Sequence, residues 1–160
     1  MSLKVVRDDF FRDMTTFGGA LFSLLVFFIL LINSINWAVL FAGGIIILMG
    51  VVIGIRLVYF KARPRKQQFN SIIEKIDASS FPSLHAARAI FIAIFVGLMF
   101  SVGLLSWALM MSGALMVGYS RIYMQKHDWI DVVCGWMLGI MVGFLLFKLN
   151  FFSFGLYFGL

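Results

Sequence analysis

The sequence predicts an all-α fold, a polytopic membrane bundle of about five transmembrane helices with short interfacial helices. First, 62% of the 160 residues are hydrophobic and only 12% are charged, whereas soluble domains carry roughly 25% charged residues. Second, the mean hydropathy is +1.04. Third, the apolar residues form runs of about 20, the length that a helix needs to cross a bilayer. These features exclude a soluble domain, a disordered chain and a nucleic-acid-binding protein, and residues 1–160 are expected to form one integral membrane domain.

The chain is expected to begin with an interfacial helix. Within residues 1–14, the apolar side chains share one helical face: Leu3, Val6, Phe10 and Met14. A helix with this pattern lies in the plane of a membrane interface. A first span is expected at about 16–36. A second begins at Trp37, a residue type that is common at interfaces, and ends at about Phe60.

Residues 61–82 form the one long polar connection, and a short helix is expected inside it. Four apolar residues recur at the spacing i, i+3, i+4, i+7: Phe69, Ile72, Ile73 and Ile76. Because this spacing places them on one helical face, they predict an amphipathic helix that lies beside the spans.

Three more spans complete the predicted bundle. The third is expected from Ser83 to about Leu104, and the fourth ends near Tyr123 after a short connection. A polar turn leads into the fifth, at about 129–149. The last residues, 150–160, are apolar and aromatic but too few to cross a bilayer, so they are expected to lie at the interface.

Two groups of glycines have the spacing that lets membrane helices approach closely. They are Gly50 and Gly54, and Gly135, Gly139 and Gly143. Packing inside one five-helix bundle is the favoured use. A dimer interface is the alternative, so a monomer and a homodimer both stay open.

With five spans, the N-terminus, the 61–82 connection and the turn at 123–128 share one membrane face. That face holds all 7 acidic residues, both histidines and every one of the 13 basic residues except Lys148.

Retention of basic loops in the cytoplasm explains the surface lysines. It does not explain ionisable residues at or inside the ends of spans, which are costly there and are functional candidates. These are Arg56, His85, Arg88, Arg121, His127 and Asp131. Because arginine forks match phosphate oxygens, this group predicts an anionic substrate.

Three segments within residues 56–131 form one pattern. They are Arg56, six residues and Arg63-Pro64; Phe81-Pro82-Ser83-Leu84-His85; and Ser120-Arg121, five residues, His127, three residues and Asp131. Together they resemble the tripartite signature of the type 2 phosphatidic acid phosphatase superfamily of membrane lipid phosphatases. That signature reads Lys-x6-Arg-Pro, Pro-Ser-Gly-His and Ser-Arg-x5-His-x3-Asp. The third segment matches at every fixed position. The others depart at Arg56, where the family usually has lysine, and at Leu84, where it usually has glycine.

The residues also suit phosphoryl transfer without the resemblance. His127 and Asp131 are four residues apart, so their side chains meet on a helix. A carboxylate on one imidazole nitrogen fixes the tautomer and leaves the other nitrogen free to attack. His85, from another span, can protonate the leaving oxygen. The phosphoryl oxygens can be neutralised by arginines and by amides near a helix start: Arg56, Arg63 and Arg121, with Ser83 and the amides of Leu84 and His85.

The resemblance implies a role for each residue. His127 would be the nucleophile that forms a phosphohistidine, Asp131 would orient it, and His85 would be the acid and then the base for the hydrolytic water. Phosphate binding would fall to Arg56, Arg63, Ser83, Ser120 and Arg121. Arg88 is not in the signature, and snorkelling to the interface and contact with the substrate are equal alternatives for it. The family works without a metal, and two histidines and one nearby aspartate among arginines make a poor cation site, so no metal and no cofactor are expected.

We therefore expect a metal-independent lipid phosphatase that removes the terminal phosphate of a lipid phosphate or a polyprenyl diphosphate. Polyprenyl diphosphate, such as undecaprenyl diphosphate, is the first candidate. Phosphatidylglycerol phosphate, phosphatidic acid and the 1-phosphate of lipid A are the others. One alternative is a lipid phosphotransferase that uses the same phosphohistidine with an alcohol as acceptor. Another is a non-enzymatic lipid-binding or transport protein that retains the basic cavity.

Two indications of membrane orientation disagree. The small size suggests a prokaryotic enzyme of the cytoplasmic membrane, and the family's sites usually face the periplasm, the exterior or an organelle lumen. The excess of basic residues instead places the site face in the cytoplasm. We expect the extracytoplasmic orientation, because site chemistry and interfacial helices supply many of these charges.

Overall fold

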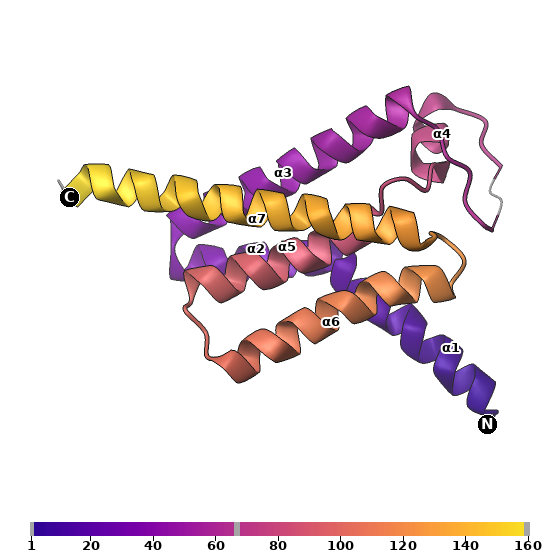
Figure 1. The fold of residues 1–160 in the computed structure, drawn as a ribbon, viewed down its shortest axis with the longest axis horizontal. Helices are drawn as coiled ribbons and strands as arrows, with labels where there is room; N and C mark the ends of the chain where they lie inside the picture. The colour runs from indigo at the N-terminus through magenta and orange to yellow at the C-terminus, as the bar shows by residue number, and fades with distance from the viewer. Residues whose placement is uncertain (1, 66–67, 159–160) are drawn as a thin grey trace.

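The computed structural model describes residues 2–65 and 68–158, with side chains as far as Leu149. These residues form a helical bundle (Figure 1). The elements are α1 (Leu3–Met14), the 3-10 turn η1 (Thr15–Gly18), α2 (Ala20–Asn33), α3 (Ile35–Val58), α4 (Ile72–Ala78), α5 (Leu84–Met99), α6 (Leu104–Tyr123) and α7 (Trp129–Phe158). The described residues form no strand, only an isolated antiparallel bridge between Ala62 and Ser79. The predicted all-α fold class is confirmed.

Five helices, α2, α3, α5, α6 and α7, take the places of the five expected spans. Within the described ranges, two stretches are long and apolar enough to cross a bilayer: Ile35–Val58, with 24 residues, and Trp129–Leu149, with 21. The pair Leu3–Gly18 and Ala20–Asn33, bent by 47°, makes a third if it is taken as one span.

Two of the five helices are shorter than the expected spans. α2 has 14 residues and begins only at Ala20, because residues 15–18 form η1 and Gly19 is extended. α5 has 16 residues. It ends at Met99 because Ser101 adopts a left-handed conformation with a φ of 47°, which is a common way to end a helix.

Helix α5 lies at the centre of the bundle. Every residue from Ala86 to Phe95 is buried in α5, whereas α3 buries one residue per turn. The buried stripe of α3 consists of Ala38, Phe41, Gly44, Leu48, Val52 and Arg56. A helix that is apolar all round and buried on one stripe faces lipid with the rest of its surface. Because Arg56 continues the stripe, it points into the bundle.

The glycines of α7 allow it to lie against α5. A Cβ atom at Gly135 would stand 2.4 Å from the Ser83 carbonyl oxygen, and one at Gly139 would stand 2.3 Å from that of Ala87. Gly143 also faces α5, where a Cβ atom would stand 2.8 Å from the Ile94 side chain. Packing inside the bundle is therefore confirmed for this group. It is wrong for Gly50 and Gly54, where an added Cβ would meet nothing within 4 Å, because their face of α3 is open.

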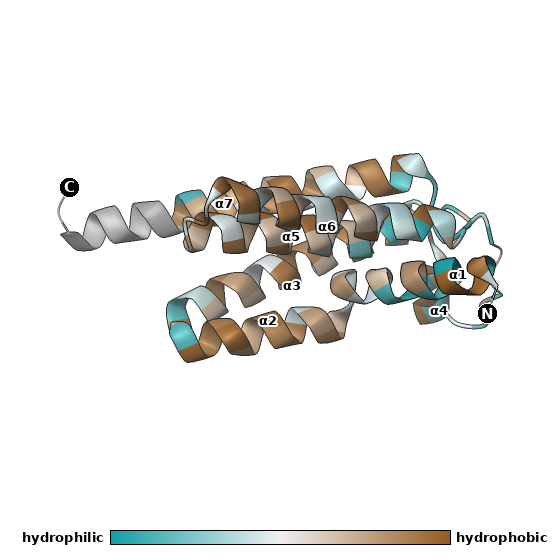
Figure 2. Ribbon diagram, turned by 90° about the horizontal axis from the view of Figure 1, so that it is seen from below, coloured by the Kyte–Doolittle hydropathy of each residue, from teal (hydrophilic) through white to brown (hydrophobic). Residues whose placement is uncertain are grey.

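The hydrophilic residues gather at one end of the bundle. Figure 2 shows most of them at the end that carries α1 and α4, with a smaller group at the turn between α2 and α3. The predicted N-terminal helix is confirmed as α1, which has no buried residue. It is fastened to α6, since Arg7 Nε donates to the Tyr123 hydroxyl at 2.7 Å and that hydroxyl donates to Asp8 at 2.5 Å. Lys66, one of the basic residues of this face, lies outside the described residues.

The predicted amphipathic helix in the 61–82 connection is shorter than expected. It begins at Ile72 and excludes Phe69. Ser71 caps it by accepting from the Glu74 backbone N–H at 3.2 Å, and Glu74 accepts in return from the Asn70 N–H at 2.6 Å. These two bonds start the helix at this point. At the other end of the chain, residues 150–158 continue α7.

Candidate active site

The three signature segments meet at the hydrophilic end of the bundle. The site residues that are buried there are Arg56, Ser83, Arg88, Ser120, Arg121, His127 and Asp131. Arg63, Leu84 and His85 are half-buried. Since buried ionisable groups are costly without partners, the contacts that these groups make determine what the site can do.

His127 and Asp131 form the pair that their spacing predicts. His127 Nδ1 lies 3.6 Å from Asp131 Oδ2. His127 stands in the turn between α6 and α7, which is closed by its own N–H and that of Lys126, both donating to the Arg121 carbonyl oxygen at 3.2 and 3.0 Å. Burial lowers the pKa of the His127 imidazole below its usual value, and the Asp131 carboxylate offsets only part of this effect. His127 is therefore neutral at neutral pH, as a nucleophile must be.

The second segment packs directly on this pair. The Ser83 backbone N–H donates to the Asp131 carbonyl oxygen at 2.9 Å. The Ser83 hydroxyl caps α5 by accepting from the Ala86 N–H at 3.5 Å. Leu84 and His85 follow in the first turn of α5, where backbone amides have no helical acceptor and favour an anion. His85 interacts electrostatically with Arg121, Arg88 and His127.

Arg56 forms hydrogen bonds with the backbone of the protein through both terminal nitrogens. Its two terminal nitrogens donate to the carbonyl oxygens of Ile76, at 3.2 Å, and Pro82, at 3.0 Å. Ile76 lies in α4, and Pro82 immediately precedes Ser83, the N-cap of α5. Arg56 therefore clamps the backbone that leads into the second segment.

The other arginines differ in their contacts. Arg63 donates to the Asp77 carbonyl oxygen and lies 4.0 Å from the Asp77 carboxylate. Arg121 donates through one terminal nitrogen to the Thr15 hydroxyl at 2.8 Å. Within the described part of the chain, the Nε atoms of Arg56, Arg88 and Arg121 are buried without a hydrogen-bond partner. Buried donors of this kind are rare in folded proteins, and an anion with several acceptor oxygens suits them.

Thr15 is a site residue that the sequence pattern does not reveal. Its hydroxyl accepts from Arg121, and it lies 3.3 Å from the Ser120 hydroxyl, which donates to the Val117 carbonyl oxygen at 2.7 Å. The turn η1 is held there because Gly18 has no side chain: a Cβ atom would stand 2.6 Å from the His85 carbonyl oxygen. A threonine in an interfacial segment carries no signal that would have identified it.

Lys61 is a second residue that the sequence pattern does not reveal. Its ammonium group lies 2.6 Å from Asp128 Oδ2 and 2.7 Å from Asp131 Oδ1. Burial opposes the charge on Lys61, but the hydrogen bonds to both aspartates outweigh it, and the pKa of Lys61 lies above its usual value. In the sequence Lys61 stands at a variable position of the first segment and resembles any basic residue at the end of a span.

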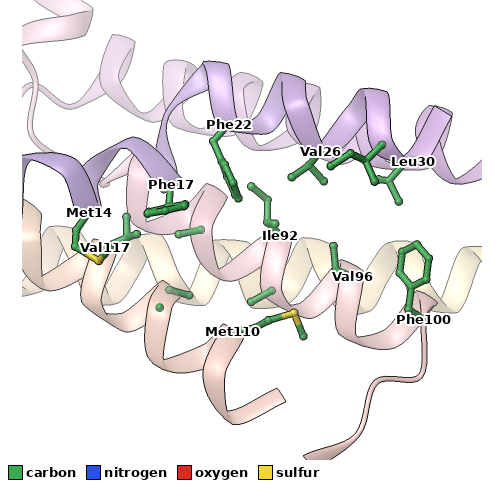
Figure 3. A pocket seen from close by; sticks show the side chains of 15 residues that line it. Met14, Phe17, Phe22, Val26, Leu30, Ile92, Val96, Phe100, Met110 and Val117 are labelled. Carbon is green, nitrogen blue, oxygen red and sulfur yellow. The ribbon is translucent and has the colours of Figure 1, made fainter. Parts of the chain in front are cut away.

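An apolar cavity of about 480 Å³ begins one helical turn below the site. Its lining includes Val117, one turn before Arg121, and Ala89, one turn after His85. Met14 and Phe17, on either side of Thr15, line it as well. Figure 3 shows side chains of α2 facing those of α5 and α6 across this cavity. The lining residues are all apolar, so the cavity suits a hydrocarbon chain.

The signature order and the folded site agree with one known family. The sequence profile described as the PAP2 superfamily matches residues 37–154. The chain belongs to the PAP2 superfamily. The match runs from the first turn of α3 into the last part of α7 and includes all three segments, whereas α1, η1 and α2 precede it. The expected resemblance is confirmed, although the roles of the individual residues stay predictions.

A curated relative of the chain is the undecaprenyl-diphosphatase BcrC of Bacillus subtilis. The two sequences are 34% identical over 111 residues, which is 68% of this chain and 56% of BcrC. The chain therefore spans little more than half the length of this relative. Its name gives a lipid diphosphate as the substrate of BcrC.

Two solved structures share the fold. LpxE of Aquifex aeolicus has a TM-score of 0.74 and 25% identity, with 89% of this chain and 86% of LpxE covered. A transmembrane PAP2-type phosphatidylglycerolphosphate phosphatase of Bacillus subtilis has a TM-score of 0.66 and 20% identity, with 94% and 78% covered. The second likeness shows the fold alone. Both agree in fold with the helical bundle described above.

Proposed function

We propose that this PAP2 protein is a membrane phosphatase that hydrolyses the terminal phosphate of a lipid phosphate or diphosphate through a phosphohistidine on His127. One observation carries the proposal. The buried His127–Asp131 pair stands beside His85 and beside arginines whose buried Nε donors have no partner in the described chain. A nucleophile, an acid and an anion site are thereby gathered at one point, which is what phosphoryl transfer requires.

The residues divide the reaction into two steps. In the first, the neutral His127 Nε2 attacks phosphorus, the N–P bond forms, and the bond to the leaving oxygen breaks while His85 transfers a proton to that oxygen. In the second, His85 takes a proton from a water molecule whose oxygen attacks phosphorus, and the N–P bond breaks to release phosphate. Asp131 faces Nδ1 and keeps the proton there in both steps.

The proposed reaction uses no metal ion. Among residues 2–65 and 68–158, no group of three or more His, Cys, Asp or Glu residues could hold one. The charge on the transferring phosphoryl group would instead be neutralised by Arg63, Arg88 and Arg121 and by the first amides of α5. Activity in the presence of EDTA tests this part of the proposal.

The substrate would be a lipid whose hydrocarbon chain enters the apolar cavity. A phosphate bound beside His127 and Arg121 would have its ester oxygen near Val117, which lines the cavity one turn before Arg121. At about 30 Å³ for a group of methylene size, 480 Å³ holds roughly 16 groups. A polyprenyl diphosphate is the first candidate, and the name of the relative BcrC supports it.

In the proposed arrangement, the chain forms a single domain in a prokaryotic cytoplasmic membrane, with the site on the extracytoplasmic side. Several of the basic residues that would favour the cytoplasm are engaged in the site, since Arg56, Arg88 and Arg121 are buried and Lys61 is paired. A cysteine introduced at Asn70, in the long connection, tests the orientation. An impermeant maleimide should label it in intact cells, and labelling only after lysis would reverse the assignment.

Phosphate release across a panel of lipids tests the function. Purified protein in EDTA should release phosphate from undecaprenyl diphosphate, phosphatidylglycerol phosphate, phosphatidic acid or lipid A 1-phosphate, and His127→Ala should abolish the release. Undiminished turnover by that variant would refute the phosphohistidine. A product formed only with an added alcohol would establish a phosphotransferase. Tight lipid binding without turnover would establish a non-enzymatic protein.

A further inference from the structure

Lys61 connects the loop of the first segment with the proposed catalytic pair of the third. Its ammonium group bridges Asp128 and Asp131, at 2.6 and 2.7 Å. The Asp131 side chain is 0% exposed, whereas that of Lys61 is 24% exposed. A carboxylate buried so completely needs a charged partner close by, and Lys61 is that partner.

The contacts of the Asp131 carboxylate fix its orientation. Oδ1 accepts from Lys61, while Oδ2 accepts from the Asp128 backbone N–H at 3.1 Å and faces His127 Nδ1 at 3.6 Å. A rotation of the carboxylate that separates Oδ2 from the imidazole also breaks the bond to Lys61. The bond to Lys61 therefore holds the oxygen that faces His127.

Lys61 is itself fixed by backbone contacts. Its N–H donates to the Ser79 hydroxyl at 3.3 Å, and its carbonyl oxygen accepts from the Ser80 N–H at 2.8 Å. Its ammonium group also lies 6.0 Å from the centre of the Phe81 ring. Lys61 thus contacts the second segment and the residues just before it, and its position depends on how the segments pack.

We propose that Lys61 is a positioning residue, which holds the Asp131 carboxylate toward His127 and offsets its negative charge. The proposal rests on the proposed function, in which His127 attacks as a neutral imidazole. An unpaired carboxylate at this distance favours the imidazolium, which cannot attack phosphorus. With Lys61 in place, Asp131 would fix the tautomer of the neutral His127 imidazole and would not favour the charged imidazolium.

Other charged groups also act on His127, and of these Lys61 contacts only the aspartates that it bridges. Arg121 of α6 and Arg63 of the long connection act on His127, and His127 in turn interacts electrostatically with His85 of α5. Lys126 and Asp128 flank His127 in the turn. A difference between the wild type and a Lys61 variant therefore reports on Lys61 and the two aspartates it bridges.

The kinetic test compares Lys61→Met, Lys61→Arg and the control Lys75→Met, a lysine of α4 outside the site. Lys61→Met should lower kcat by about 30-fold or more and change KM by less than about threefold. The acid limb of its kcat/KM profile should move up by about one pH unit. Lys61→Arg should recover much of the activity, and Lys75→Met should match the wild type. The proposal would be overturned if Lys61→Met kept the kcat and the pH profile of the wild type, or if this variant changed only KM.

A direct titration separates this proposal from the proposed function. The chain has only two histidines, so ¹⁵N-histidine spectra can be assigned with the variant His85→Gln. The titration midpoint of His127 should rise in Lys61→Met, and an unchanged midpoint would overturn the proposal. Lys61→Gln keeps a hydrogen-bond donor but not the charge, and it should raise the titration midpoint of His127 as well. This variant replaces Lys61→Met in the test if Lys61→Met does not fold. If the wild type hydrolyses no lipid phosphate, the proposed function fails while this titration still decides the role of Lys61.

Discussion

Filling the apolar cavity beside the site should weaken turnover of long-chain substrates and spare short ones. Gly113 of α6 lines the cavity, and a Cβ atom there would meet nothing within 4 Å, so Gly113→Leu has room for the first atom of its side chain without a backbone shift. The leucine side chain takes up roughly 120 Å³, about a quarter of the 480 Å³. It therefore displaces about four methylene groups of a bound lipid chain.

The cost of this displacement is set by packing. The displaced chain enters the bilayer and not water, so no hydrophobic free energy is lost. If each of about four groups loses a few contacts worth about 0.1–0.2 kcal/mol, the loss is about 1.5 kcal/mol. That corresponds to roughly a tenfold fall in kcat/KM.

The assay compares undecaprenyl diphosphate with isopentenyl diphosphate, whose five-carbon chain is too short to reach Gly113, two helical turns below Arg121. Gly113→Leu should lose about tenfold on the first and little on the second. Gly50→Leu on the open face of α3 is the matched control, because a Cβ there also meets nothing within 4 Å. An equal loss on both substrates, or an equal loss in the control, would refute the assignment of the cavity to the lipid chain.

Three further predictions concern packing, positioning and pH. Gly139→Ala places a methyl group 2.3 Å from a backbone carbonyl of α5 and should cost about 1–3 kcal/mol, visible as a lower Tm, whereas Gly54→Ala on the open face should not lower Tm. Thr15→Val removes the hydroxyl that accepts from Arg121 at 2.8 Å and should lower kcat/KM by roughly five- to tenfold, about 1 kcal/mol, while an unchanged value would exclude Thr15 from the site. Because burial lowers the pKa of His127 and the attacking form is neutral, kcat/KM should hold as the pH falls to the usual histidine pKa of about 6.5 and decline only below it. An acid limb above that value would contradict a neutral, buried nucleophile.

The number and order of the helices could be predicted because apolar runs of bilayer length have few other solutions. Their ends could not, because they depend on single backbone conformations. The left-handed Ser101 ends α5, and the extended Gly19 delays α2. The start of α4 was readable, since Ser71 and Glu74 have the spacing of a capping box, but the hydrophobic period extended the prediction back to Phe69.

Candidate site residues could be predicted where an ionisable side chain stands in or next to a membrane span. A histidine, an aspartate or an arginine at or inside the end of a span is costly, so His127, Asp131 and Arg121 stand out in the sequence. Thr15 and Lys61 do not, because a threonine near an interface and a lysine after a span need no special explanation. The contacts of Thr15 and Lys61 are visible only in the folded structure. There Thr15 meets Arg121, and Lys61 meets Asp131.

The departure from the family signature at Arg56 has a structural explanation. Arg56 donates to two carbonyl oxygens at once, at 3.2 and 3.0 Å, through the planar fork that a lysine lacks. Both acceptors belong to the backbone that leads into Ser83, so Arg56 stabilises the start of α5 and keeps only Nε free of a partner in the described chain. In the proposed reaction the phosphate charge would therefore fall mainly on Arg63, Arg88 and Arg121. If the site binds phosphate as proposed, Arg56 would therefore act mainly by holding the backbone of the site in place and less by binding the phosphate itself.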